Sequence, residues 1–564
     1  MPLRQTDALA RWPGLAGGRQ AAWLARALPL ACIVLALGTL VLPVALTHMP
    51  PLLDYPNHLA RMWLLAGGAE HAPLDRIYGV DWSGASTNIG IDLLAATVGR
   101  LVGGWTLAPL LLGAAVLLPP LGAVLLNRAV FGGWHWWQAG FAVLAWNSTL
   151  LAGFLNFQIG LGLALLAAAA DLALRWAGPL GVVPLRMGLG TVLLVFHPFA
   201  AGLYGVLLAG LAFGAEFGPR GGQVPFGRRI WQAAVAAGLG VGFPVACFLL
   251  LAPTLPGGHA PGIYDAWAGF TIADKAVTLL SAVATYDLRL DIVAVLLLWA
   301  AARLVASGPL LRCHAGLLLA ALGLVVLAVL VPSTLGGTAF VDWRFPIMAV
   351  LTAAASFRPD LRSARAGQAM AVALMLLALA RTGWIASIWQ ERQADVAAVE
   401  DVLAFVPAGA AVLPVEHTGT DGAEMPRGRV LAVGLPLHWH LPSLAVPLRQ
   451  AFVPTLFTAP GKQPLRVLPP WAEISVLEGM PAPVRDLRAF VPTPWEAYMV
   501  GYVAHWRERF DYVLVLNAQL PDADDEASVP GLELLADRGF ARLYRILREE
   551  GERPGTRHAV ERAE

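Results

Sequence analysis

Long apolar segments recur through the first 389 residues and restrict the folds open to this chain more than any other feature. The first runs from residue 27 to about residue 47, and it is long enough to cross a bilayer, which needs about 20 residues. The pattern predicts a polytopic α-helical membrane protein of about eleven spans. The ten further segments are 106–126, 137–153, 157–175, 187–197, 199–214, 230–252, 291–306, 313–331, 343–357 and 367–389.

The composition agrees with this fold class. Hydrophobic residues make up 57% of the chain and charged residues only 14%, well below the quarter that is typical of soluble proteins. The basic residues form no run and no stripe interleaved with aromatic residues, so nucleic acid is not expected as a partner. The three cysteines lie far apart in apolar stretches, which favours buried single residues over disulfides.

The acidic residues divide the chain into two regions. Of the 38 Asp and Glu residues, 24 follow residue 389. We therefore expect a transmembrane domain over residues 1–389 and a soluble α/β domain over residues 390–548. The charged tail at residues 549–564 is expected to be disordered.

The second region alternates helix-like and strand-like patterns. Its aromatic-rich segments at residues 449–457 and 495–506 are suited either to packing against the membrane domain or to stacking on a sugar. The predicted helices are 395–405 and 532–538, and the predicted strands are 411–415, 512–516 and 541–546.

The arginines predict the orientation, since they concentrate in cytoplasmic loops. Agreement at every loop requires a break between two spans at His197-Pro198, and it requires that residues 91–104 do not cross. That segment places its apolar residues on one helical face with Asp92 and Arg100 off it, as in an interfacial helix. The N-terminus is then cytoplasmic and the C-terminal domain lies outside.

The choice of basic residue suggests the type of membrane. The chain is rich in Ala and has only two lysines, which is typical of proteins from GC-rich bacterial genomes. We therefore expect a multi-pass protein of a bacterial inner membrane, with the C-terminal domain in the periplasm.

The loop at residues 50–105 carries a concentrated polar motif. It opens with PLLDYPNHLAR at residues 51–61, where Pro56 suits the first turn of a helix and Asp54 lies at its N-terminal end. Asn57, His58 and Arg61 share one face of that helix. In one reading Asp54 is a helix cap and His58 and Arg61 are headgroup anchors. In the other the cluster is functional, since charge near membrane depth is costly.

A multispanning chain with this first loop and a soluble C-terminal domain resembles the GT-C superfamily of membrane glycosyltransferases. The resemblance covers the membrane domain as an architecture and is specific at Asp54, which matches the family's catalytic acid in the first loop. The string DYPNHLAR is also similar to the opening of uncharacterised bacterial proteins assigned to that superfamily. The resemblance implies a polyprenyl-phosphate or polyprenyl-diphosphate sugar donor and a glycan, lipid or protein acceptor.

Inverting sugar transfer needs a base for the proton of the acceptor and a cation for the departing phosphate. The resemblance implies Asp54 as the base. Arg344 is the first candidate for the phosphate, with Asp342 beside it to orient it, although a snorkelling arginine paired with Asp342 is the alternative. Arg61 is the second candidate.

Three further residues are expected near the same mouth of the membrane domain. His58 and Asn57 share the helical face of Arg61, and His197 lies at the predicted external turn between two spans. For His197 the alternative is a buried imidazole bonded to the backbone.

No cofactor is predicted from the residues. Where some members of the superfamily carry a metal-linked acidic motif, this chain has the amides Asn147 and Asn156, which are weak ligands for hard cations. His438 and His440 have neither Cys nor carboxylate company in the sequence, so a divalent metal is possible but unsupported.

The sequence therefore predicts a membrane glycosyltransferase that acts on the outer face of the membrane. The alternatives are a lipid or solute transporter or flippase, which should show repeated halves, and a noncatalytic scaffold with an external binding domain.

Overall fold

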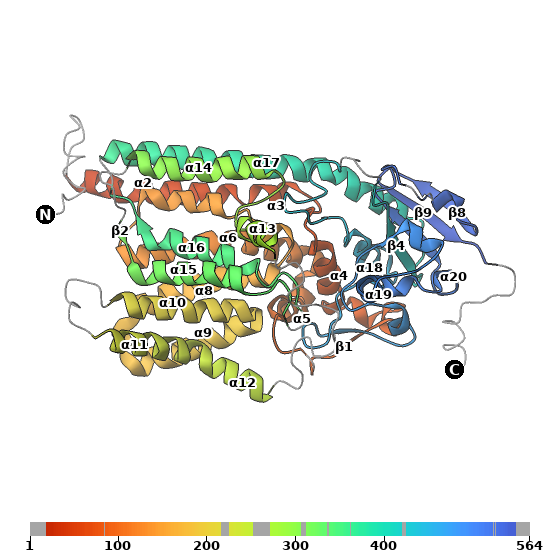
Figure 1. The fold of residues 1–564 in the computed structure, drawn as a ribbon, viewed down its shortest axis with the longest axis horizontal. Coiled ribbons are helices and arrows are strands. Elements are labelled where there is room, and N and C mark those ends of the chain that lie inside the picture. The colour runs from red at the N-terminus through yellow and green to blue at the C-terminus, as the bar shows by residue number, and fades with distance from the viewer. Residues whose placement is uncertain are drawn as a thin grey trace.

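The chain forms a bundle of long helices with a small β-sheet at one end (Figure 1). The helix α2 begins at the end of the bundle far from the sheet. The computed structural model describes residues 18–83, 85–215, 225–251, 271–305, 312–335, 338–360, 363–419, 425–522, 524 and 526–548. The expected disordered tail at 549–564 lies outside the described residues.

Most of the predicted apolar segments are helices of the bundle. Within the described residues, six helices are long and apolar enough to cross a membrane, and the span count of eleven stays a prediction. The helices of the bundle are α2 Gly18–Thr39, α6 Gly104–Phe131, α8 Leu155–Ala173, α9 Gly178–Phe196, α10 Pro198–Ala215, α11 Phe226–Ala237, α12 Phe243–Leu251, α14 Leu288–Val305, α15 Ala315–Leu330, α16 Arg344–Ser356 and α17 Ala364–Leu403.

Two of the predicted apolar segments are interrupted in the structure, one of them as predicted and the other not. The predicted break at His197-Pro198 is confirmed, because α9 ends at Phe196 and α10 begins at Pro198. The segment 137–153 is not one α-helix: a 3₁₀ helix, Trp136–Leu144, precedes the short helix α7, Ser148–Leu151. Asn147 separates them because its side chain accepts a hydrogen bond from the Leu150 N–H, which caps α7.

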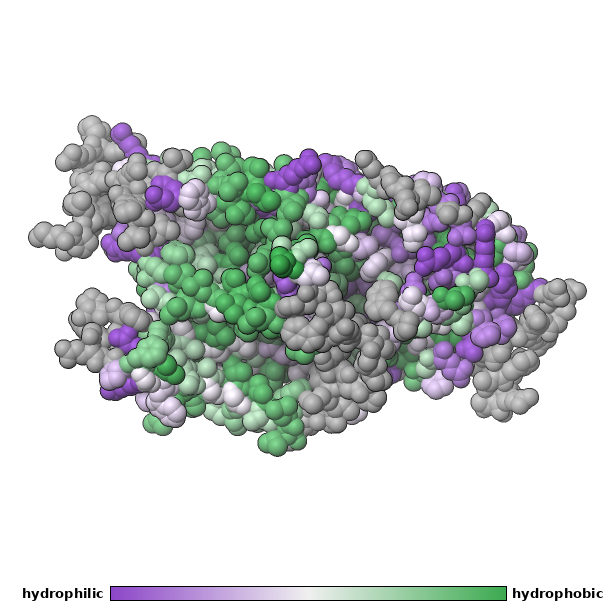
Figure 2. Space-filling view, viewed as in Figure 1, coloured by the Kyte–Doolittle hydropathy of each residue, from purple (hydrophilic) through white to green (hydrophobic). Residues whose placement is uncertain are grey.

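The outer surface of the bundle is apolar. Hydrophobic residues cover the helical part in Figure 2, and hydrophilic residues gather over the sheet and at the opposite end. An exposed apolar area of this extent is typical of a membrane-facing surface. On α14, α15 and α17 the exposed residues include Leu296, Leu297, Trp299, Leu319, Leu322, Val326, Val372 and Leu376.

The first loop packs over the sheet end of the bundle. A strand of this loop pairs antiparallel with a strand from the C-terminal region, with Tyr78 opposite Val467. Residues far apart in the sequence therefore meet at one end of the helices. The elements are α3 Leu42–Leu46, α4 Tyr55–Leu65, β1 Tyr78–Val80, α5 Gly90–Val102 and β5 Leu465–Val467.

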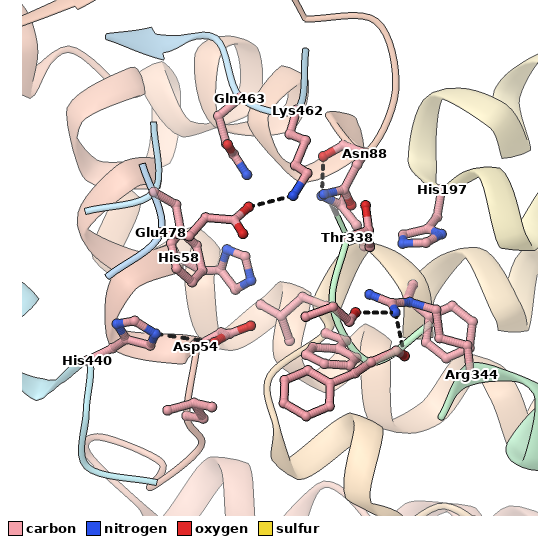
Figure 3. Close-up of a pocket in the computed structure, with 18 of the residues that line it drawn as sticks. Asp54, His58, Asn88, His197, Thr338, Arg344, His440, Lys462, Gln463 and Glu478 are labelled. Atoms are coloured by element: carbon pink, nitrogen blue, oxygen red, sulfur yellow. Dashed lines mark hydrogen bonds and ion pairs between the residues drawn. The ribbon is translucent and has the colours of Figure 1, made fainter. Parts of the chain in front are cut away.

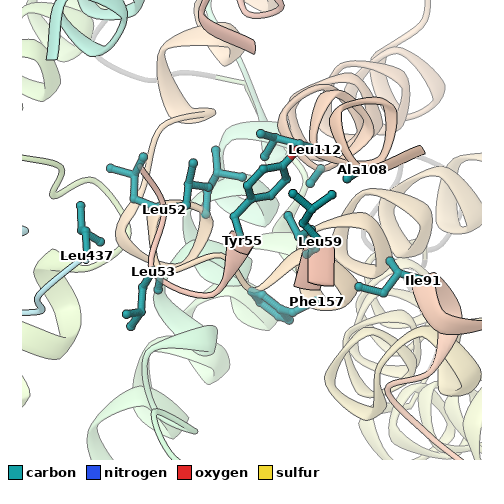
Figure 4. Close-up of a cluster of buried hydrophobic side chains, with 14 of the residues drawn as sticks. Leu52, Leu53, Tyr55, Leu59, Ile91, Ala108, Leu112, Phe157 and Leu437 are labelled. Carbon is teal, nitrogen blue, oxygen red and sulfur yellow. The ribbon is translucent and has the colours of Figure 1, made fainter. Parts of the chain in front are cut away.

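The helix α4 begins where Pro56 predicts and is buried along nearly its whole length. Tyr55 and Leu59 point toward Ala108 and Leu112 of α6 (Figure 4). This packing holds the N-terminus of α4 in place, and with it the preceding Asp54.

The helix α5 forms as predicted, but the expected position of Asp92 was wrong. Asp92 is fully buried and accepts hydrogen bonds from Arg61, from Nε at 2.6 Å and from Nη2 at 3.3 Å. The two charges compensate each other, so α5 can bury a face that includes a carboxylate. Arg100 stays exposed and pairs with Glu70.

The C-terminal region contains a mixed sheet in the order β6-β4-β7-β9-β8. β4 pairs parallel with β6 and β7, whereas β9 pairs antiparallel with β7 and β8. The predicted strands are confirmed within a residue at their ends. Their bounds are β4 Val412–Glu416, β6 Ala482–Pro483, β7 Tyr512–Leu516, β8 Leu532–Asp537 and β9 Ala541–Ile546.

The predicted helix at 532–538 was wrong, because residues 532–537 form the strand β8. Gly539, at φ +71°, turns the chain so that β8 and β9 pair as a hairpin. The remaining elements are α13 Ile272–Leu280, α18 Ala445–Arg449, α19 Pro494–Val500, α20 Trp506–Arg509, β2 Arg312–Cys313 and β3 Phe357–Arg358.

The helix α17 runs through the expected domain boundary at residues 389 and 390. It is continuous for 40 residues, and its C-terminal part contacts β9. The increase in acidic residues after residue 389 therefore begins within one helix and does not coincide with a linker between two domains. A continuous helix at this point joins the bundle to the sheet without an irregular segment between them.

Candidate active site

A cavity of about 250 Å³ lies between the ends of the helices and the C-terminal region (Figure 3). Asp54 and Arg344 point into it from opposite sides. The helical wall includes Asp54, His58, Asn156, Phe157, His197 and Arg344, and the C-terminal wall includes Trp439, His440, Phe457, Lys462, Gln463 and Glu478.

Asp54 occupies the N-cap position of α4 without acting as a cap. Its φ and ψ are −83° and −8°, and its side chain makes no capping hydrogen bond. The backbone is held instead, since the Asp54 N–H donates to the Ala152 carbonyl at 3.1 Å. The neighbouring Gly153 has φ +86°, and a Cβ there would lie 2.9 Å from Asp54. The carboxylate is therefore free to face the cavity.

The environment of Asp54 favours its neutral form. Burial and the negative charge of Glu478 raise the pKa of Asp54 to about 8, against the opposing effect of Arg61 and Arg344. His440 Nε2 lies 3.5 Å from Asp54 Oδ1, and burial lowers the pKa of His440 to about 3. The imidazole is thus neutral near pH 7, and the carboxylate that faces it is an unusually strong base once ionised.

Arg344, the first residue of α16, carries the cationic charge of the helical wall. Its Nη1 donates to the carbonyls of Ala339 at 3.0 Å and Phe340 at 2.6 Å. The guanidinium lies over the rings of Phe154 and Phe199, 4.8 and 5.4 Å from their centroids. Among the described residues its buried Nε has no hydrogen-bond partner. Aromatic rings hold a cation without neutralising it, so this charge is available to an anion.

Asp342 does not orient Arg344 as the sequence interpretation expected. Its carboxylate accepts hydrogen bonds from Lys275 at 2.7 Å, Thr278 at 2.9 Å and Ser333 at 2.9 Å. Lys275 and Thr278 are three residues apart on α13 and share a face. Asp342 therefore fixes the loop before α16, and its negative charge lies near enough to act on Arg344 without a hydrogen bond to it.

Arg61 lies away from the cavity because its guanidinium is fully buried against Asp92. Asn57 is also behind the wall, where it bonds to the C-terminal region. Its Nδ2 donates to the Thr455 carbonyl and its Oδ1 accepts from the Phe457 N–H, both at 3.0 Å. The structure thus gives Asn57 a positioning contact and gives Arg61 a buried ion pair.

His58 and His197 both line the cavity. Burial and the charge of Arg61 hold the pKa of His58 well below its usual value, so the imidazole is neutral. His197 Nδ1 accepts from the Phe199 N–H at 3.2 Å, which closes the turn between α9 and α10. His197 is therefore bonded to the backbone and also faces the site.

The C-terminal wall holds residues that sequence reasoning missed. Lys462 Nζ lies 2.7 Å from Glu478 Oε1, and both side chains face the cavity with Gln463 (Figure 3). They lie in coil segments without periodicity. The aromatic-rich stretch at 449–457 was the available signal, and its last residue, Phe457, does line the cavity.

Within the described residues, no group of three or more His, Cys, Asp or Glu side chains is arranged to hold a metal ion. Asp54, His440 and Glu478 each line the cavity, but Glu478 is paired with Lys462.

No protein-family model and no curated protein matches the chain. Among solved structures, it is similar to the crystal structure of ArnT from Cupriavidus metallidurans bound to undecaprenyl phosphate. The two are 11% identical with a TM-score of 0.45, and the match covers 93% of this chain and 98% of that chain. Both values are low, so the function has to be inferred from the residues of this chain.

Proposed function

We propose that this protein is a membrane glycosyltransferase that moves a sugar from a polyprenyl-linked donor to a cell-envelope acceptor. The observation that carries the proposal is one cavity at the end of the helical bundle, in which Asp54 faces Arg344. Asp54 caps no helix, and Arg344 has no carboxylate partner among the residues that the structure describes. A base and an anion-binding group on opposite sides of one space are what displacement at a sugar phosphate requires.

In the proposed reaction the acceptor hydroxyl attacks the anomeric carbon of the donor. Asp54 takes the proton from that hydroxyl as the new carbon–oxygen bond forms. The bond between the anomeric carbon and the phosphate oxygen breaks, and the lipid phosphate leaves with the electron pair. Arg344 stabilises the charge that develops on the phosphate. A single displacement of this kind inverts the anomeric centre.

A second feature supports a donor with a long apolar chain. A groove of about 210 Å³ lies between α8 and α9. Phe157 of α8 and His197, which directly follows α9, line the cavity. A lipid whose phosphate lies at Arg344 would therefore find apolar surface along the neighbouring helices. The groove is lined by Leu163, Leu166, Ala167, Ala170, Leu189, Val192 and Leu193.

The proposed orientation places the cavity on the outer face of the membrane and the start of α2 on the cytoplasmic side. The position of α2 supports it, because this helix begins at the end of the bundle far from the sheet (Figure 1). Cysteine-accessibility labelling at exposed positions of β8 in intact cells tests it. Labelling that occurs only after the inner membrane has been permeabilised, so that the reagent reaches the cytoplasm, would contradict this orientation.

The function is tested with purified protein in detergent, undecaprenyl-phosphate sugars and an envelope lipid extract as the source of acceptors. We expect release of undecaprenyl phosphate by the native protein and loss of release in Asp54→Asn. Glu70→Gln is the matched control, because that carboxylate is exposed and lies outside the cavity. Equal release by native protein and Asp54→Asn would exclude Asp54 as the base.

A further inference from the structure

A buried polar cluster connects the sheet to the wall of the cavity. Glu416 is the last residue of β4, and its carboxylate binds two consecutive side chains. Oε1 accepts from Trp439 Nε1 at 3.0 Å, and Oε2 lies 2.6 Å from His438 Nε2. Asn517, which follows β7, approaches the same imidazole at 2.9 Å. Because β4 and β7 are parallel, the cluster lies at the carboxyl ends of both strands.

The two residues that follow His438 reach the cavity. Trp439 is half-buried and lines it, and His440 lies 3.5 Å from Asp54. The indole N–H of Trp439 is already bonded to Glu416, so the part of the side chain left for the cavity is carbon surface. The carboxylate therefore fixes an aromatic surface beside the proposed base.

We infer that Trp439 is the surface on which the sugar ring of the donor packs, and that Glu416 is a positioning residue that holds the indole for this contact. The inference rests on the proposed function. One face of a sugar ring presents C–H bonds, which pack on an aromatic face, while its hydroxyls need polar partners. The same wall supplies such partners in Lys462, Gln463 and Glu478.

Glu416 is suited to positioning because both of its oxygens are used. Two hydrogen bonds from consecutive residues restrict the backbone between them as well as both rings, which limits the orientations that Trp439 can adopt. The amide in Glu416→Gln keeps only one acceptor oxygen, so it can bond to both rings only if the His438 imidazole accepts from the amide instead of donating to it. The variant should loosen the indole without removing it.

The test compares the affinity of the protein for undecaprenyl phosphate with its affinity for undecaprenyl phosphate glucose, mannose and arabinose. The ratio of the two affinities isolates the contribution of the sugar. We expect at least one sugar-bearing lipid to bind native protein about tenfold more tightly than the bare lipid. Trp439→Ala should abolish this ratio and leave the affinity for the bare lipid unchanged.

Two further variants separate positioning from a structural role. As a single substitution, Glu416→Gln should lower the ratio of the two lipid affinities. Added to Trp439→Ala it should have no further effect on that ratio, because Glu416 acts through the indole. Trp506→Phe is the matched control: its indole N–H donates to the Leu487 carbonyl away from the cavity, so the ratio should not change. If Glu416 had only a structural role, Glu416→Gln would instead lower the thermal stability of the protein, and it would lower its affinity for both lipids equally.

The outcomes separate the inference from the function on which it rests. Native protein that binds neither kind of lipid would contradict the proposed function itself. Native protein that binds the bare lipid, but shows no preference for any sugar-bearing lipid or keeps its preference in Trp439→Ala, would overturn the role of Trp439 alone.

Discussion

The two walls of the cavity differ in how they hold their charges. On the helical wall, Asp54 has a neutral imidazole as its near neighbour, and Arg344 is held by backbone carbonyls and aromatic rings. On the C-terminal wall, Lys462 and Glu478 are paired with each other at 2.7 Å.

This difference indicates which wall is suited to bind a charged substrate and to accept a proton. A buried ionisable group without an opposite charge is costly to ionise, so a fold keeps one mainly where a ligand or a proton transfer uses it. A charge that is already paired contributes shape and hydrogen bonds more than net charge. The helical wall is thus the proposed reacting wall, and the C-terminal wall the proposed recognition wall.

The largest expected effect comes from removing the base on the helical wall. In Asp54→Asn, the amide cannot accept the proton of the acceptor, and loss of a general base typically lowers the rate about 100-fold to 10,000-fold. The fold should survive, because Asp54 caps no helix. Transfer rate and thermal unfolding in detergent are measured together, and a stable variant with full transfer would contradict this role.

The second effect concerns the charge on the same wall. Arg344→Lys keeps a positive charge but loses the planar fork, and an ammonium cannot bond to both carbonyls and a phosphate in the same geometry. We expect the affinity for undecaprenyl phosphate to fall about tenfold to a hundredfold. Unchanged affinity would show that Arg344 serves only to anchor the turn before α16.

A smaller effect links the two walls through pH. The proposed base must be ionised, so kcat/KM of native protein should fall as the pH drops below about 8, the raised pKa of Asp54. The charge of Glu478 contributes to that rise, and its removal in Glu478→Gln should lower the pKa. The acid limb of the pH profile should then move to lower pH, whereas a limb that stays in place would separate Glu478 from Asp54.

The smallest effect on the site is expected at a paired charge behind the helical wall. Arg61→Met leaves Asp92 buried without its partner, which typically costs about 3–5 kcal/mol of stability. The affinity of the folded fraction for undecaprenyl phosphate should not change. Arg100→Met is the control, because its exposed pair with Glu70 contributes at most about 1 kcal/mol. If Arg61→Met lost lipid binding while it remained folded, Arg61 would have to be counted among the residues that bind the lipid phosphate.

Elements with a strong local signal could be predicted from the sequence. Apolar length predicted the helices of the bundle, and the distribution of arginines over the loops predicted the break between α9 and α10 at His197-Pro198. Pro56 located the start of α4. Residues 532–537 contain no comparable signal, and their secondary structure depends on pairing with β9. The sequence interpretation therefore predicted a helix where the structure has a strand. Likewise, Asp92 is buried because Arg61 lies opposite it, which no pattern within α5 reveals.

The same distinction holds for the candidate site. Asp54, His58, His197 and Arg344 lie at helix ends, where polar residues stand out in an apolar chain, and the structure brings all four to one cavity. The C-terminal wall could not be predicted, because it depends on a pairing between Tyr78 and Val467. Residues such as Glu478 become recognisable only once that pairing is known.

The pairing of β1 with β5 also sets an order of events during biosynthesis. The ribosome adds about 5–20 residues per second, so β5 is made roughly 20–80 s after β1. Until the segment that contains Thr455, Phe457 and β5 is made, the wall opposite Asp54 has only its early residues, such as Trp439 and His440, and Asn57 lacks its two hydrogen-bond partners. A chain stopped before residue 450 would contain all the helices of the bundle and still lack Phe457, Lys462 and Glu478, so an enclosed site depends on the last fifth of translation.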